Sequence, residues 1–237
     1  MEYFYEALLT FCWFVVPIIV LGIICIALRF LCKIPDFIFR KVLHLISALM
    51  IVELIVVPIH WWIAEIIIGI SLIGLTILLL IFEHTEVYKK FFVEKSKHEV
   101  LISFWLFFLV VASLIAFFWG YLGNTNRYYV IIAILSWAFG DAIAAILGRL
   151  IGKHKVSGKF IEGEKSIEGS VACFLLAFIV PFILLIALFN YPWWLSLFDA
   201  LAVGLAVSFM ELFTKKGLDN LTCPLTASVV LFLFSLI

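Results

Sequence analysis

The polar residues that could carry chemistry are few in this 237-residue chain, and the clearest is Asp141. It lies in an otherwise apolar stretch, and a charge in the middle of a membrane span costs about 2.5–3.5 kcal/mol on insertion scales, so such residues are candidate functional residues. Small residues follow it at helical spacing, at Ala144, Ala145, Gly148 and Gly152. The stripe favours close helix packing, which needs no carboxylate. We therefore expect a chemical role for Asp141.

The connection after Asp141, residues 148–170, has a composition suited to binding phosphate. It holds five glycines and five basic residues and leads directly into the next apolar segment. Cationic side chains and the free N–H groups at a helix start both favour phosphate, although a solvated basic loop with glycine turns remains an alternative. The candidate phosphate-binding residues here are Arg149, Lys155, Lys159, Lys165, Ser166, Gly169 and Ser170.

Two further polar stretches lie where apolar segments begin or end. Arg40, Lys41 and His44 open the second segment, and Glu211, Asp219 and Asn220 flank the last connection. Each has a structural alternative: a packing histidine, basic residues that only set topology, or a helix cap at Asp219 and Asn220. Independent structural roles would scatter these groups, whereas all four stretches fall at the same ends of the segments.

Carboxylates in these stretches could hold a metal ion. Asp141 and Asp219, with Glu211 and Asn220 nearby in sequence, offer the oxygen ligands that Mg²⁺ takes together with substrate phosphates. We expect Mg²⁺ or another divalent cation at this site. Arg40 and Lys41 would attract and orient a nucleotide or lipid headgroup.

The elements that must position these residues are membrane helices. Hydrophobic residues make up 66% of the chain and charged residues 14%, against roughly a quarter charged in soluble domains. Apolar runs of about 20 residues predict transmembrane helices. We expect an all-α polytopic membrane protein with a single domain over 1–237, whose connections are too short for a soluble domain. Eight spans are predicted, at 7–31, 41–57, 61–82, 100–120, 128–147, 169–189, 195–213 and 221–237.

Basic residues predict the orientation of these spans. Of the 16 Lys and Arg residues, all except Arg127 fall on one side of the predicted membrane, which the positive-inside rule makes cytoplasmic. Both termini should then lie on the other side, and the four polar stretches should share the cytoplasmic face. In a prokaryote this would be the inner membrane. A basic face attracts anionic headgroups or anionic substrates.

The four stretches, in order over residues 36–226, resemble the motifs of the dolichol kinase and phytol kinase family, which includes CTP-dependent diacylglycerol kinases. The matching motifs are Arg40-Lys41-x-x-His44, Gly140-Asp141-Ala142-x-Ala144-Ala145-x-x-Gly148-Arg149, Lys165-Ser166-x-Glu168-Gly169-Ser170 and Asp219-Asn220-Leu221-Thr222-x-Pro224-Leu225.

This resemblance implies an enzyme that uses CTP, or another nucleoside triphosphate, and a divalent metal to phosphorylate a lipid alcohol. The acceptor would be a polyprenol, a phytol-like alcohol or diacylglycerol. Carried over to this chain, the core of the site is Asp141, Lys165, Ser166, Asp219 and Asn220. The base for the lipid hydroxyl is open between Asp141 and His44.

Two other functions stay open at this point. Phosphatidate cytidylyltransferases use the same nucleotide and metal, but a pattern resembling theirs, His-Gly-Gly followed by Asp-Arg-x-Asp near the C-terminus, is absent from the sequence. An ion-coupled carrier could use Asp141, although such carriers often show internal repeats, and none is visible. No nucleic-acid partner is expected, and the oligomeric state is open.

Overall fold

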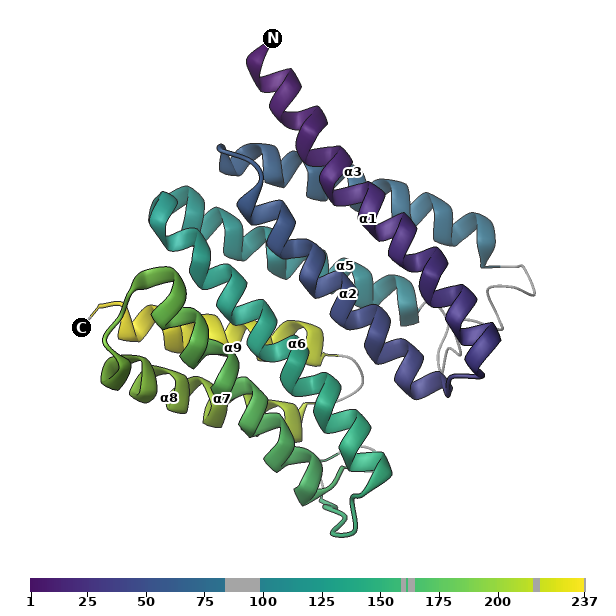
Figure 1. The fold of residues 1–237 in the computed structure, drawn as a ribbon, viewed down its shortest axis with the longest axis vertical. Coiled ribbons are helices and arrows are strands. Elements are labelled where there is room, and N and C mark those ends of the chain that lie inside the picture. Colours follow the sequence, from purple (N-terminus) through teal and green to yellow (C-terminus); the bar gives the residue numbers. More distant parts are fainter. Residues whose placement is uncertain (84–98, 159–160, 162–164, 215–217, 237) are drawn as a thin grey trace.

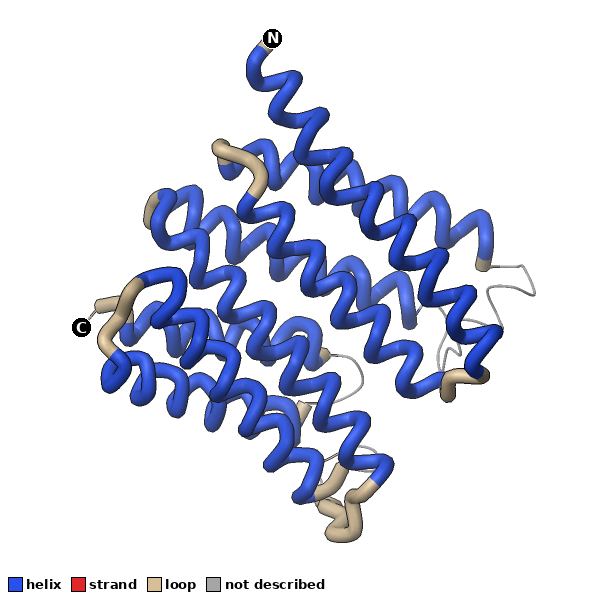
Figure 2. The backbone as a smooth tube through the Cα atoms, in the orientation of Figure 1, coloured by secondary structure: helices blue, strands red, loops and turns tan. Residues whose placement is uncertain are grey.

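A computed structural model describes residues 1–83, 99–158, 161, 165–214 and 218–236 of the chain. The described residues are almost entirely helical, and Figure 2 shows no strand among them. Their only extended pairing consists of two isolated bridges, Lys155 with Ser166 and Gly158 with Ile161. The predicted all-α class is confirmed. Its physical cause is that a segment in lipid must satisfy its backbone hydrogen bonds internally.

Each predicted apolar segment forms a helix, in the predicted order. The helices are α1 (Glu2–Cys32), α2 (Asp36–Val56), α3 (Trp61–Phe82), α5 (Glu99–Leu114, continued by a π-helical stretch, Ile115–Tyr121), α6 (Arg127–Leu150), α7 (Ile167–Phe189), α8 (Trp193–Phe213) and α9 (Asp219–Phe234). The boundaries differ at some ends: α1 begins at Glu2 rather than residue 7, and α6 continues to Leu150 rather than ending at 147.

Six helical stretches in the described part of the chain are long and apolar enough to cross a membrane. The remaining two helices are α2, which carries charged residues near its start, and α9, which has 16 residues. The protein is a multi-pass membrane protein. The count of eight crossings and the side on which each terminus lies stay predictions.

Helix α6 forms the centre of the bundle. Figure 1 shows it between α2 on one side and α7, α8 and α9 on the other, and it packs directly against α2, α7 and α9. In its most apolar stretch 72% of the residues are buried inside the protein, against 6% for α1. The residue that the sequence singles out, Asp141, therefore lies on an enclosed helix, which also contacts α8 and α5.

Candidate active site

The four polar stretches meet at one end of the bundle. Lys41 in α2 donates a hydrogen bond to the Asp141 carboxylate in α6, with 2.5 Å between Nζ and Oδ2, across 100 residues of sequence. Lys41 also interacts electrostatically with Glu211 at the end of α8 and Asp219 at the start of α9. Lys165, just before α7, interacts with Asp141 and Asp219. We call Lys41, Asp141, Lys165, Glu211 and Asp219 the charged cluster.

Asp141 and His44 lie side by side in this cluster. The Asp141 side chain is only 6% exposed, and His44 Nε2 lies 3.7 Å from Asp141 Oδ2. His44 Nε2 is buried without a hydrogen-bond partner, and its ring meets Trp137 edge-on at 4.3 Å between centroids. The packing expected of His44 is thus present against Trp137, although its Nε2 makes no hydrogen bond, and a catalytic role for His44 stays a prediction. The two candidate bases therefore adjoin each other.

Lys165 joins the connection before α7 to the end of α8. Its Nζ donates to the Glu211 carboxylate at 2.9 Å, to the Glu211 backbone carbonyl and, at 3.5 Å, to the Thr214 carbonyl. These carbonyls lie at the C-terminal end of α8, where the helix dipole favours a cation. A hydrogen bond of 2.8 Å between the Thr214 and Thr222 hydroxyls links the same end to α9.

Asp219 is not the N-cap of its helix. It is the first residue of α9, whose N-cap is Leu218, and no side-chain cap hydrogen bond forms there. The N-cap alternative is therefore wrong for Asp219, which lies instead in the first turn of α9, where a negative charge favours the helix. Its carboxylate interacts electrostatically with Asp141, Lys41 and Lys165.

The charged cluster does not form a ready-made metal site. Among the residues that the structure describes, no group of three or more His, Cys, Asp or Glu side chains is arranged to hold a metal ion. The expected ligands Asp141 and Glu211 instead bind lysine ammonium groups. A divalent cation would need oxygen ligands from elsewhere, such as substrate phosphates.

Glu168 holds the connection against the start of α7, a role that sequence reasoning missed although the residue stands in a motif. Its carboxylate accepts the backbone N–H groups of Lys153 and His154 at 3.1 and 3.2 Å and contacts His154 Nδ1 at 2.7 Å. The backbone N–H of Val156 donates to the Lys165 carbonyl at 2.9 Å. These bonds fix the chain on both sides of Lys165. The sequence signal for this role is a carboxylate in the first turn of a helix that follows a glycine-rich loop, where it can accept backbone N–H groups of the loop.

Ser166 and Gly169 have clear structural roles. Ser166 is the N-cap of α7, 2% exposed, and its Oγ accepts the Gly169 N–H at 3.2 Å. A Cβ on Gly169 would lie 2.9 Å from the Ala144 carbonyl oxygen and 3.2 Å from the Gly148 Cα. The packing interpretation of the small-residue stripe is thus confirmed. Phosphate contacts by Ser166 and Gly169 stay a prediction.

Gly169→Ala should therefore destabilise the protein. The added methyl meets backbone atoms of α6, which cannot swing aside as a flexible side chain can, and overpacking costs about 1–3 kcal/mol. Gly74→Ala is the matched control, because nothing lies within 4 Å of a Cβ at Gly74. Thermal unfolding of the two variants in one detergent should show a lower midpoint for Gly169→Ala alone. Equal midpoints would contradict the close contact of α6 with α7.

The other predicted phosphate-binding residues differ in their exposure. Arg40 and Lys155 are exposed, Asn220 and Ser170 are half-buried, and the Arg149 guanidinium lies over the Phe37 ring at 5.0 Å. Lys159 lies outside the described residues. The structure thus brings together Lys41, His44, Asp141, Lys165, Glu211 and Asp219. Phosphate binding by the other residues stays a prediction.

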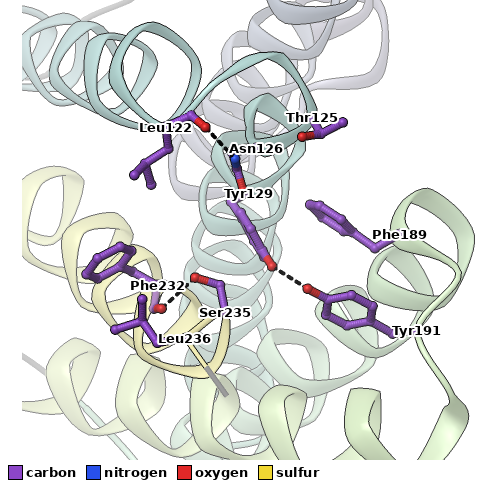
Figure 3. A pocket seen from close by; sticks show the side chains of 9 residues that line it. All are labelled: Leu122, Thr125, Asn126, Tyr129, Phe189, Tyr191, Phe232, Ser235 and Leu236. Carbon is purple, nitrogen blue, oxygen red and sulfur yellow. Dashed lines mark hydrogen bonds between the residues drawn. The ribbon is translucent and has the colours of Figure 1, made fainter.

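A pocket of about 380 Å³ lies elsewhere on the bundle (Figure 3). Tyr129 and Tyr191 line it and share a hydrogen bond of 2.7 Å between their hydroxyls, next to the Phe189 and Phe232 rings. None of the described residues that line it is charged. Tyr129 precedes Asp141 by 12 residues on α6, which is about 18 Å along the helix. The pocket is therefore separate from the charged cluster.

Comparison with curated proteins finds a phytol kinase of Synechocystis sp. (strain ATCC 27184 / PCC 6803 / Kazusa) that is 32% identical over 102 residues. The predicted resemblance to the phytol and dolichol kinase family is confirmed. The match covers 43% of this chain and 42% of that phytol kinase, so it spans less than half of either protein. No family model matches the chain, and no solved structure matches it.

Proposed function

We propose that this protein is a membrane kinase that transfers the γ-phosphoryl group of a nucleoside triphosphate, CTP, to a lipid alcohol. The acceptor would be a polyprenol, a phytol-like alcohol or diacylglycerol, bound at the cytoplasmic leaflet. The observation that supports this proposal most strongly is the charged cluster, in which lysines and carboxylates from distant segments meet at one end of the bundle. The partial similarity to a phytol kinase supports the same reaction class.

The charged cluster has the groups that phosphoryl transfer needs. Catalysis of this reaction is mostly positioning and neutralisation of charge on the transferred group. Lys41 and Lys165 would bind phosphate oxygens, and Asp141 and Asp219 would hold a divalent cation together with those oxygens. When bound, the cation would neutralise charge developing on the phosphates. Asp141 or His44, which adjoin each other, would accept the proton of the lipid hydroxyl.

Cytidylyl transfer to phosphatidate is the second candidate, because the same lysines and carboxylates could serve it. The two reactions differ in the phosphorus atom that is attacked. In a kinase the lipid hydroxyl attacks the γ-phosphorus and CDP leaves. In a cytidylyltransferase the phosphatidate oxygen attacks the α-phosphorus and pyrophosphate leaves. A carrier is the third candidate. Carriers bind their substrates near the middle of the membrane, whereas the charges here gather at one end of the bundle, where α8 ends and α9 begins.

The position of a label in CTP separates these candidates. Purified protein in mixed lipids that contain a polyprenol, phytol, diacylglycerol and phosphatidate should move label from γ-labelled CTP into lipid. Label from α-labelled CTP should stay in the water-soluble fraction. A parallel reaction with γ-labelled ATP tests the choice of donor. Label entering lipid only from the α position would replace the kinase by the cytidylyltransferase, and no transfer from either position would favour a carrier.

A further inference from the structure

Lys165 lies at the base of the connection between α6 and α7, where two segments of the chain run side by side. The Val156 N–H donates to the Lys165 carbonyl at 2.9 Å, and the Ile167 N–H donates to the His154 carbonyl at 3.0 Å. An antiparallel bridge lies between these two hydrogen bonds. The segment that arrives from α6 is therefore paired with the segment that carries Lys165 into α7.

The Glu168 carboxylate holds this base from the first turn of α7. Its Oε1 accepts the backbone N–H groups of Lys153 and His154 at 3.1 and 3.2 Å, and it lies 2.7 Å from His154 Nδ1. The His154 ring is 74% exposed, and exposed ion pairs contribute little to stability. The two backbone N–H groups are thus the contacts through which Glu168 fixes the arriving segment.

The place of the Lys165 ammonium depends on this base. Its Nζ donates to the Glu211 carboxylate at 2.9 Å and to the Thr214 carbonyl at 3.5 Å, so the side chain reaches from the connection to the end of α8. Holding a lysine side chain in one conformation is costly in entropy. A binding group keeps its place within about 0.5 Å only when neighbouring contacts hold its backbone and side chain.

We infer that Glu168 is a positioning residue for the nucleotide, and that it acts through Lys165. Its hydrogen bonds to the arriving segment keep the Lys165 backbone where the ammonium reaches the charged cluster and can bind a phosphate oxygen. The inference rests on the proposed function and adds to it a residue outside the charged cluster. Residue 168 must then supply an oxygen acceptor for two N–H groups, whereas a metal ligand or a base would need the negative charge itself.

A double-mutant cycle on nucleotide binding tests this role without turnover. Purified protein in lipid nanodiscs is titrated with labelled CTP, and with labelled ATP in parallel. Glu168→Ala should weaken binding roughly 3- to 10-fold, the equivalent of a lost hydrogen bond. Added to Lys165→Met, the same change should cause no further loss, because a residue that acts through Lys165 has no effect once the ammonium is gone. Fully additive losses would overturn the inference.

Three single variants separate the hydrogen bonds from the charge. Glu168→Gln keeps an oxygen that can accept both N–H groups and should bind nucleotide nearly as the wild type does. His154→Ala removes only the exposed ring and should also change little. Glu2→Ala is the matched control, because it removes an exposed carboxylate from the first turn of α1. A loss in Glu168→Gln as large as that in Glu168→Ala would overturn the inference.

A general loosening of the protein would give a different result. It would weaken binding of the lipid alcohol as well, whereas Glu168→Ala should leave the affinity for the lipid alcohol unchanged. If Glu168→Ala does not fold, Glu168→Asp takes its place in the cycle, since its shorter side chain withdraws the carboxylate from the two N–H groups. Failure of the proposed function is a separate result, in which the wild type binds nucleotide but transfers no γ-label. Wild-type protein that binds neither nucleotide would overturn the inference too.

Discussion

Asp141→Asn should reduce phosphoryl transfer by roughly 10²–10³-fold or more, the loss typical of removing a preorganised electrostatic group from an active site. Asp141 is the member of the charged cluster that contacts both Lys41 and His44. The amide cannot hold a cation as a carboxylate does, nor can it take a proton. Transfer from γ-labelled CTP into lipid, normalised to the folded protein in the membrane, measures the loss.

The ion pair between Lys41 and Asp141 means that Asp141→Asn changes stability as well as activity, and a double variant separates the two effects. Neutralising a charge within a span would be well tolerated on desolvation grounds alone. Asp141→Asn, however, leaves the Lys41 ammonium, 22% exposed, without its nearest partner, and breaking a buried pair costs about 3–5 kcal/mol. The double variant Asp141→Asn/Lys41→Met removes both charges. It should recover thermal stability while remaining inactive.

Two comparisons decide what Asp141 does. Recovery of activity together with stability in the double variant would make Asp141 only a counter-ion for Lys41. Asp36→Asn is the matched control, since Asp36 is 60% exposed and pairs with Arg29 at 2.7 Å. Exposed pairs contribute about 0–1 kcal/mol, so Asp36→Asn should leave both stability and transfer nearly unchanged.

Lys165→Met should raise the KM for the nucleotide roughly 10- to 100-fold, the equivalent of one hydrogen bond between charged groups, with a much smaller change in the KM for the lipid alcohol. The physical reason is that the Lys165 ammonium lies in the charged cluster and its expected partner is a phosphate oxygen. Initial rates over a range of CTP at saturating lipid, and the converse, give the two constants. Lys153→Met is the control, because Lys153 is an exposed residue of the same connection.

A purely structural role for Lys165 would give a different pattern. Its hydrogen bonds to the Glu211 carboxylate and to carbonyls at the end of α8 tie the connection to that helix. If these hydrogen bonds were the only role of Lys165, Glu211→Gln would weaken them similarly. Both variants would then lose stability, and in both the KM values for nucleotide and for lipid alcohol would rise together. A rise confined to the nucleotide in Lys165→Met would assign the residue to phosphate binding.

The order of the apolar helices in the described part of the chain was predictable from the sequence for a simple reason. In lipid, backbone N–H and C=O groups can form hydrogen bonds only within their own helix, so long apolar runs become helices. Each of the eight predicted runs forms a helix among the residues that the structure describes. Polar residues are rare in and beside these runs, which made the candidate site easy to identify. A charge next to hydrocarbon costs free energy, so such a residue is a candidate for a functional role. Asp141, Lys41, Lys165, Glu211 and Asp219 could thus be selected from their positions along the chain.

Which of these groups bind one another was decided only by the tertiary structure. Lys41 and Asp141 are 100 residues apart. The pattern of residues along one helix does not predict which other helix that helix will contact. The stripe of small residues beside Asp141 packs against α7, and Ser166 caps that helix. How closely two helices approach depends on the packing of the whole bundle. Hydrogen bonds and ion pairs act over a few ångströms. The sequence by itself determined which polar groups reach one end of the membrane bundle, and the packing of α2, α6, α8 and α9 decided how their charges are shared.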